Sequence, residues 1–286
     1  MTGSAKMVEE RVVVLGGRGM LGTDLAVALQ QKNVTPIVFD LPQFDITNKQ
    51  QLEKAIERAQ VIINCAAYTN VEKAESEPDL AYKVNAEAVG NLGSAAKKTG
   101  AWVLHISTDF VFDGKSDTPY VETDQPNPIN TYGKSKLAGE QLLLESGCKN
   151  CIMRLEWTYG MAGNNFVTKL ISSARQGKKL KVVDDQIGSP TATTQVAEAI
   201  YKILTLKPEG IFHFANAGFV SRYEMAKFIF EKFKIDADLD SCKSSDYKTA
   251  AQRPLNSRFN CDKIKALLGE DIEHWQIPLE RFLEQL

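Results

Sequence analysis

The features that mark membrane, secreted and nucleic-acid-binding proteins are missing from this sequence. Its 286 residues contain no apolar run near the roughly 20 residues that a membrane-spanning helix needs. The net charge of −2 gives no support for a nucleic-acid partner or an anionic membrane surface. Residues 1–10 contain no apolar stretch of the kind that secretory signals carry, and we expect them to form a flexible leader. These absences favour a cytoplasmic protein with no nucleic-acid and no membrane partner.

Cysteine and histidine are scarce, with five and three residues. Without a secretion signal, five cysteines do not indicate a disulfide framework. Cys148 and Cys151 form a C-x-x-C pair, but zinc needs four ligands and no second cysteine or histidine pair stands at ligand spacing. The sequence therefore predicts no metal site.

Short β-branched runs alternate with helical patterns over the first part of the chain, and glycine-bearing or polar turns separate them. The expected strands are 11–15, 35–39, 61–65, 102–106 and 149–155, and the expected helices include 23–31, 49–59 and 74–98. This alternation predicts βαβ units and a parallel sheet covered by helices on both faces. Ligands of such sheets bind beyond the carboxyl ends of the strands, so we expect one pocket at that edge.

A glycine-rich turn follows the first expected strand. Gly17, Gly19 and Gly22 match the pattern G-x-G-x-x-G, and Gly16 adds the longer variant of the same pattern. Glycines at these places allow a tight turn, close approach of a pyrophosphate and close packing of helix on strand. The turn lies between a strand and a helix, and Asp40 closes the next strand, which is the context that a dinucleotide site requires.

The choice of cofactor is left open by the residues around this turn. Asp40 suits the 2′-hydroxyl of an NAD ribose and would repel a 2′-phosphate, whereas Arg18 could bind that phosphate. Asp45 and Ile46 could flank the adenine, although an ordinary strand-to-helix loop explains them equally well. We therefore expect NADPH or NADH, with use of both open.

A second group of residues could carry proton transfer. Tyr132 precedes Lys136 by four residues, which places both side chains on one face if the segment is helical. A phenol titrates near about 10, and a fixed cation beside it lowers that pKa. Thr108, next to Ser107 at the end of an expected strand, could donate to a carbonyl oxygen while the tyrosine supplies a proton. These residues predict a general acid beside a dinucleotide cofactor.

The pattern loosens after residue 160, where polar loops surround expected helices. The expected elements here are loops at 163–166, 184–191 and 243–260, helices at 167–176 and 193–206, and a strand at 210–214. We expect an NAD(P)-binding, Rossmann-like, doubly wound α/β domain of residues 8–160 plus about 192–216. A smaller, mostly helical substrate-binding lobe of about 161–191 plus 217–286 would fold over the sheet edge, without a clearly independent core pattern.

The chain resembles the extended short-chain dehydrogenases/reductases and, among them, the dTDP-4-dehydrorhamnose reductases. The matching segments are 16–22, 64–69, 71–77, 107–113, 132–140, 163–166, 185–191 and 253–258. Segments 16–22 and 132–140 are shared by the whole superfamily, whereas 185–191 and 253–258 are more particular to the rhamnose reductases. The resemblance implies NAD(P)H-dependent reduction of the C4 ketone of a nucleotide-sugar substrate, dTDP-4-dehydro-L-rhamnose, to dTDP-L-rhamnose.

The resemblance also implies roles for single residues, with Thr108, Tyr132 and Lys136 as the catalytic ones. The candidate cofactor-binding residues are Gly16, Arg18, Gly19, Met20, Leu21, Gly22, Asp40, Asp45, Ile46, Cys65, Ala66, Ala67, Asn85, Tyr132 and Lys136. The candidate substrate-binding residues are Thr69, Val71, Thr108, Phe110, Tyr132, Glu156, Trp157, Asn165 and Arg253. Of these, Trp157 would pack near the sugar and the nicotinamide.

The chain departs from the family pattern at three places. Related dehydratases carry a carboxylic acid where Phe110 stands, which argues against elimination, and the rhamnose reductases usually carry tyrosine there. Glu156 follows Leu155 where the family usually has small hydroxyl residues. Some family members hold a metal ion at a dimer interface, but Thr194 replaces one ligand even though Asp24 could match another. A homodimer remains compatible with the resemblance, and no metal is predicted.

Glu156 raises a question of its own, since a carboxylate beside Trp157 is costly if it is buried without a partner. It could accept hydroxyls of a substrate other than dehydrorhamnose, pair with a cation such as Arg154 or Arg253, or turn out to solvent.

Two other functions remain open at this point. A nucleotide-sugar epimerase would use the same tyrosine and lysine and return the hydride to its product. A non-catalytic regulatory subunit, similar to that of methionine adenosyltransferase, could keep the fold and the nucleotide site without turnover.

Overall fold

The computed structural model describes residues 10–286, so the expectations for the leader and for the first residues of the domain lie outside the described part. A six-stranded parallel sheet forms its centre, in the order β10-β5-β4-β3-β1-β2. The strands are β1 (Val12–Leu15), β2 (Ile37–Phe39), β3 (Val61–Asn64), β4 (Trp102–Thr108), β5 (Asn150–Leu155) and β10 (Gly210–Phe214). The strand order reverses beside β1, the topology of a Rossmann-like sheet, and the predicted fold class is confirmed.

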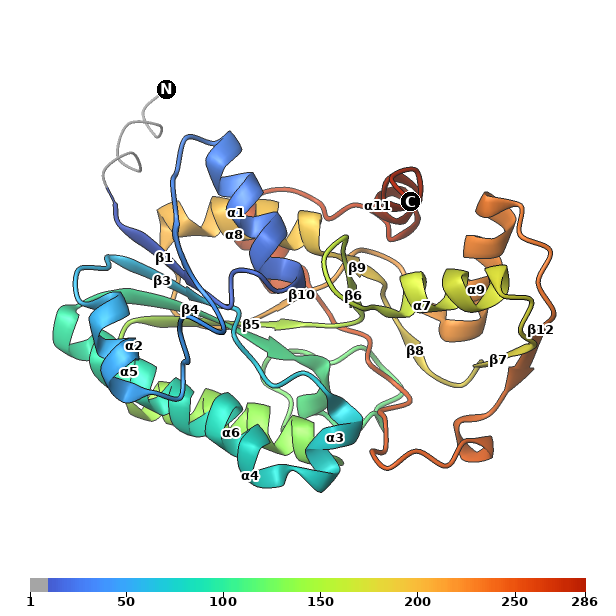
Figure 1. Ribbon diagram of the computed structural model, residues 1–286, viewed down its shortest axis with the longest axis horizontal. Helices are drawn as coiled ribbons and strands as arrows, with labels where there is room; N and C mark the ends of the chain where they lie inside the picture. Colours follow the sequence, from blue (N-terminus) through green and yellow to red (C-terminus); the bar gives the residue numbers. More distant parts are fainter. Residues whose placement is uncertain (1–9) are drawn as a thin grey trace.

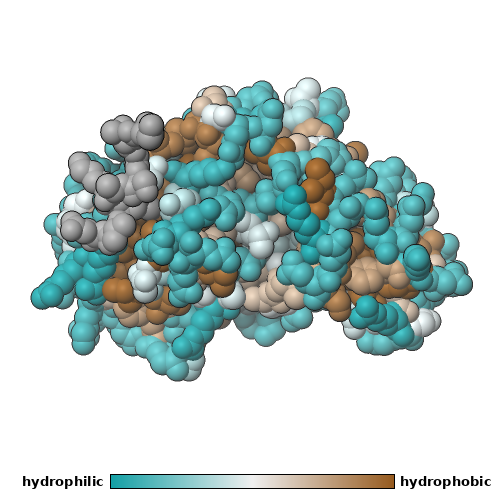
Figure 2. Space-filling view, turned by 90° about the horizontal axis from the view of Figure 1, so that it is seen from above, coloured by the Kyte–Doolittle hydropathy of each residue, from teal (hydrophilic) through white to brown (hydrophobic). Residues whose placement is uncertain are grey.

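Helices cover both faces of the sheet (Figure 1). One face carries α1 (Met20–Gln31) and α8 (Thr193–Leu206), and the other carries α2 (Lys49–Ile56), α5 (Ala88–Thr99) and α6 (Thr131–Glu145). Each side has its own buried apolar cluster, because strands buried on both faces point alternate side chains to opposite sides. Hydrophilic side chains cover most of the surface seen from above and divide its hydrophobic residues into separate patches (Figure 2). Within residues 10–286, no helix is both long and apolar enough to cross a membrane.

The single helix expected over 74–98 is wrong. The segment contains α3 (Val71–Ser76), α4 (Pro78–Tyr82), a π-helical turn over Lys83–Glu87, and α5. Pro78 has no N–H to give to the preceding turn, so a new helix begins with it as the first residue. The wide turn brings the carbonyl of Asn85 against Gly139 of α6, where a Cβ would collide with it.

The second lobe packs around a hydrophobic cluster of its own, which the sequence pattern did not reveal. Its helices are α7 (Phe166–Arg175), α9 (Arg222–Phe233) and α11 (Gln276–Leu283). Short strands that were not expected accompany them: β6 (Thr158–Tyr159), β7 (Leu180–Val183), β8 (Ile187–Gly188), β9 (Thr191–Ala192), β11 (Val220–Ser221) and β12 (Leu239–Cys242). One element of the expected lobe, α10 (Asp262–Leu268), instead packs its Ile264 into the cluster between the sheet, α1 and α8.

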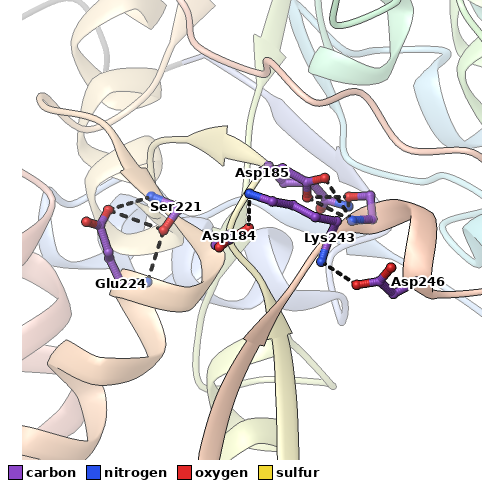
Figure 3. Close-up of polar contacts among 8 residues, drawn as sticks. Asp184, Asp185, Ser221, Glu224, Lys243 and Asp246 are labelled. Carbon is purple, nitrogen blue, oxygen red and sulfur yellow. Dashed lines mark hydrogen bonds and ion pairs between the residues drawn. The ribbon is translucent and has the colours of Figure 1, made fainter.

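Polar contacts fix the loop between β7 and β8 to the segment after β12 (Figure 3). The Asp185 carboxylate accepts hydrogen bonds from the Ser244 N–H, at 2.8 Å, and from its hydroxyl, at 2.7 Å. Lys243 adds an ion pair with Asp184 at 2.8 Å. Nearby, Ser221 caps α9 through a reciprocal contact with Glu224. These contacts join the segment that precedes β8 to the segment that follows β12.

Candidate functional site

A cleft of about 640 Å³ lies at the carboxyl ends of the strands, between the sheet and the second lobe. Many of the candidate residues line it: Gly16, Gly19, Met20, Leu21, Asp40, Asp45, Ile46, Cys65, Ala66, Ala67, Thr69, Val71, Thr108, Phe110, Tyr132, Lys136 and Trp157. They come from segments far apart in the sequence. The parallel sheet joins them because each strand delivers its last residues to the same edge.

The glycine turn is shaped to receive a dinucleotide. Gly16 has a φ of 72°, which side chains rarely adopt, and a Cβ there would lie 2.5 Å from the Ala66 nitrogen. A Cβ on Gly22 would collide with the backbone of Gly16 and Gly17, so α1 can approach the turn only with glycine at this position. Gly19 caps the amino end of α1, whose free N–H groups and dipole favour an anion. These residues fit the pyrophosphate of NAD(P).

Both oxygens of Asp40 are occupied by main-chain donors. One accepts from the N–H of Arg18 and the other from the N–H of Leu41, each at 2.7 Å. The Arg18 guanidinium lies outside the lining residues and donates to the side chain of Gln43 at 2.9 Å. In this arrangement Asp40 is fixed beside the cleft, while Arg18 stays exposed next to it.

Tyr132 and Lys136 stand on the first two turns of α6, which Asn130 caps by accepting the N–H of Gly133. The Phe110 ring packs edge-on against Tyr132, with centroids 5.5 Å apart. Lys136 is buried, and its Nζ donates to the carbonyl of Ile106 at 2.7 Å. Burial lowers the pKa of Lys136 to about 8, against an opposing effect of Glu140.

The expected lowering of the Tyr132 pKa is not what the structure gives. Burial raises this pKa to about 12, the contact with Thr108 acts to lower it, and the charge of Asp109 raises it. Thr108 donates to Asp109 at 2.9 Å, and the other oxygen of Asp109 accepts from Ser257 at 2.5 Å. Asp109 thereby joins the end of β4 to the loop that carries Ser257.

The opposite wall of the cleft is aromatic and cationic. Trp157 has a φ of 44°, a conformation that costs a non-glycine residue about 1–3 kcal/mol and is concentrated at functional sites. The Arg222 guanidinium lies 3.5 Å above the centre of its indole and 4.9 Å from that of Phe166. Among the described residues, no side chain or carbonyl accepts a hydrogen bond from this guanidinium. Arg222 therefore presents free donors to the cleft.

The chain is similar to known proteins in both its sequence and its structure. Residues 10–286 match the family model described as "RmlD substrate binding domain". A dTDP-4-dehydrorhamnose reductase from Escherichia coli is 34% identical over 96% of this chain and 97% of its own length. The chain belongs to the dTDP-4-dehydrorhamnose reductase family.

Solved structures of this reductase family agree with the assignment. The enzyme from Bacillus anthracis, crystallised in complex with NADP, is 38% identical, with a TM-score of 0.93 over 97% of this chain and 99% of that one. The enzyme from Clostridium acetobutylicum is 37% identical, with a TM-score of 0.92 over 96% and 99%.

The structure places Glu156 behind the cleft. It does not reach solvent: its side chain is buried and accepts hydrogen bonds from the N–H groups of Ser189, at 2.8 Å, and Phe259, at 3.2 Å. It does not pair with either proposed arginine, since Arg154 binds Glu140 at 2.6 Å and Arg253 binds Glu72 at 2.6 Å. It is not among the residues that line the cleft, and both of its oxygens accept main-chain N–H groups.

Five other candidate residues also lie outside the lining. Gly22 supports the turn, and Arg18 was described above. Asn85 binds the backbone of Tyr68 through both ends of its amide, at 2.8 and 3.1 Å. Asn165 caps α7, and Arg253 joins the second lobe to Glu72 of α3. These last three residues hold loops around the cleft.

The structure adds lining residues that sequence reasoning did not select. They are Leu41, Phe44, Val84, Ile106, Ser107, Asp109, Leu155, Thr158, Gly163, Asn164, Thr193 and Arg222. Ser107 and Asp109 flank Thr108, so their position could have been inferred. Arg222 had no such signal, because it lies in a helix of the second lobe and only the tertiary fold brings it to Trp157.

Asp24, which the resemblance suggested as one possible metal ligand, lies next to Thr193. The hydroxyl of Thr193 donates to the carboxylate of Asp24, which occupies that oxygen. Over the described part of the chain, no three histidine, cysteine, aspartate or glutamate side chains gather as metal ligands would.

Proposed function

We propose that this chain is an NAD(P)H-dependent reductase that converts the 4-keto group of dTDP-4-dehydro-L-rhamnose into the hydroxyl group of dTDP-L-rhamnose. One observation carries the proposal: Thr108, Tyr132 and Lys136 share a cleft with the glycine turn. Two relatives that cover nearly the whole chain, from Escherichia coli and Aggregatibacter actinomycetemcomitans, are 34% and 38% identical to it and bear the name of this reductase.

The cofactor would lie along the sheet edge. The glycine turn would receive its pyrophosphate, Asp40 its adenosine ribose, and Ala66 and Ala67 would border it where the backbone is close. Lys136 would bind the ribose next to the nicotinamide. When bound, NAD(P)H supplies the hydride that the ketone carbon accepts.

The chain's own residues handle the proton. The Tyr132 hydroxyl donates its proton to the ketone oxygen, and with a pKa raised to about 12 it is fully protonated and able to donate at neutral pH. The Thr108 hydroxyl, now directed at Asp109, would turn to donate to the same oxygen and stabilise the charge that develops there. Phe110 has no proton to give, so the site favours simple reduction over elimination.

The second lobe would hold the nucleotide sugar. Trp157 offers a flat face, and Arg222 offers donors for sugar or diphosphate oxygens. The division into a cofactor domain and a substrate-binding lobe, and a homodimer, are parts of the same proposal. Sedimentation analysis tests whether the chain forms a homodimer.

Oxidation of NADH and NADPH, followed against a panel of nucleotide-linked 4-keto sugars, tests the function. The expected result is stoichiometric oxidation with dTDP-4-dehydrorhamnose and formation of dTDP-rhamnose. Conversion without net oxidation would instead identify an epimerase. No oxidation with any sugar, together with co-purification of a partner enzyme, would identify a regulatory subunit.

A further inference from the structure

A buried chain of polar groups lies beneath Lys136. Asn64 ends β3 and His105 lies in β4, and both side chains are fully buried. Nδ2 of Asn64 is 3.1 Å from Nδ1 of His105, and Nε2 of the same ring is 3.4 Å from Nζ of Lys136. Neither residue lines the cleft, and neither has a role in the reaction proposed above.

One main-chain group fixes the order of donors along this chain. The N–H of Ala66 points at Oδ1 of Asn64 from 3.1 Å, and an amide N–H can only donate. The Asn64 oxygen must therefore face Ala66, which leaves its NH₂ group to donate to Nδ1 of His105. A neutral imidazole that accepts at Nδ1 carries its proton on Nε2. The ring thus directs an N–H at Lys136.

An ammonium group has three N–H donors and no acceptor, so it would face the His105 N–H as donor against donor. A neutral amine would accept this N–H with its lone pair and still donate to the Ile106 carbonyl, 2.7 Å away. We propose that Asn64 and His105 are positioning residues that hold Lys136 as a titrating amine, not as a permanent cation. The change in the pH profile of kcat/KM that follows from this proposal rests on the reductase function proposed above.

The other groups around Lys136 allow it to titrate near neutral pH. Glu140, on the next turn of α6, favours the ammonium, but Arg154 and Ser107 share its carboxylate. Cys65 stays a thiol, because burial raises its pKa to about 12. Burial and the Lys136 charge lower the pKa of His105 well below its usual range, so its ring is neutral.

The pKa values of Lys136 and Tyr132 predict which group sets the alkaline side of the pH profile of kcat/KM. Burial holds the Lys136 pKa at about 8, and the Tyr132 pKa of about 12 lies well above it. The profile of kcat/KM reports the free enzyme, so its alkaline limb belongs to Lys136, and activity falls as the ammonium is lost.

A second buried histidine has the opposite arrangement and serves as an internal comparison. Nδ1 of His213 lies 3.1 Å from the carbonyl of Tyr120, which can only accept, so its proton is on Nδ1. Its Nε2 lies 3.4 Å from NH1 of Arg154, which can only donate. The two neutral rings should therefore carry their protons on different nitrogens.

Long-range ¹H–¹⁵N NMR of the imidazoles tests the assignment directly, since the chain has three histidines. The expected result is a proton on Nε2 of His105 and on Nδ1 of His213. A proton on Nδ1 of His105 would overturn the proposal. This measurement needs no substrate, so it stands apart from the failure or success of the reductase assay.

Two variants test the effect on Lys136 through the pH profile. The H105F change removes the opposing N–H without adding charge. The midpoint of the alkaline fall in kcat/KM should therefore shift to higher pH, by about one pH unit. A downward shift, or none, would contradict the proposal, because an accepting Nε2 would have favoured the ammonium. In N64D the carboxylate can accept both from Ala66 and from Nδ1–H of His105, so the histidine proton should move to Nδ1 and the limb should also rise.

The same change elsewhere in the sheet is the control. Asn150 is buried at the amino end of β5, away from Lys136, and N150D should leave the limb and the His105 tautomer unchanged. An equal shift in N150D would assign the effect to buried negative charge in general and overturn the role of Asn64.

Discussion

The two walls of the cleft fix their charges in different ways. On the sheet wall, Asp40 accepts two main-chain N–H groups from residues near it in the fold of β1 and β2. On the lobe wall, the Arg222 guanidinium of α9 lies near two carboxylates, those of Asp109, which follows β4, and of Glu156, which follows β5 and lies behind the lining of the cleft. Burial raises the pKa of both acids, and Arg222 acts to lower it. The first wall is a local motif, whereas the second exists only when the lobe is in place.

The largest effect should come from the proton donor between the two walls. Y132F keeps the ring against Phe110 but removes the hydroxyl, so kcat should fall by about 10²–10⁴-fold. Cofactor affinity, measured by fluorescence titration, should stay near the wild-type value. A variant with wild-type turnover would show that the tyrosine is not the acid.

Behind the lobe wall, Glu156 should matter for stability and for the sugar more than for the cofactor. The E156Q side chain has one oxygen acceptor for two N–H groups, those of Ser189 and Phe259. The free energy of unfolding should therefore fall by about 1–3 kcal/mol. KM for the nucleotide sugar should rise while Kd for the cofactor changes little.

Denaturant titration and steady-state kinetics check this result. The matched control is E145Q, the same change at an exposed glutamate near the end of α6, which should alter neither quantity. Equal KM values for E156Q and wild type would show that the loops of Ser189 and Phe259, which Glu156 joins, have no part in binding the sugar.

Arg222 gives a smaller, more specific test of the same wall. R222Q loses the cation above Trp157, and a cation–π contact in a site of this kind contributes about 1–2 kcal/mol. We expect a KM for the nucleotide sugar raised by about tenfold, with a smaller change in kcat. R175Q, which removes a similar contact with Phe233 outside the cleft, should leave KM unchanged. A raised KM in both variants would point to a general effect on the lobe.

The smallest effect should come from the sheet wall and concern only the choice of cofactor. D40S removes the charge that would oppose a 2′-phosphate, so kcat/KM for NADPH relative to NADH should rise by about fivefold, in line with the modest energy of an exposed charge interaction. D45S, at a second aspartate of the cleft, should shift the ratio less. If both variants shift it equally, Asp40 has no special part in selecting the cofactor.

The two walls also differ in how far they could be predicted. The parallel sheet, the glycine turn and the spacing of Tyr132 and Lys136 follow from local patterns, because burial on both faces and helical periodicity leave direct marks in the sequence. The break at Pro78 was missed because the helical pattern continues through it. Arg222 was missed because nothing near it in the sequence indicates Trp157 as its neighbour.

By itself, the sequence determined the fold class and the family, and it was enough to propose the cofactor turn, the acid and the lysine. Only the tertiary structure decided that Glu156 is buried and joins two loops through the N–H groups of Ser189 and Phe259. It also decided the direction in which Asn64, His105 and Lys136 pass hydrogen bonds. The reason is that a charge or a proton is placed by every group around it, and those groups meet only when the chain has folded.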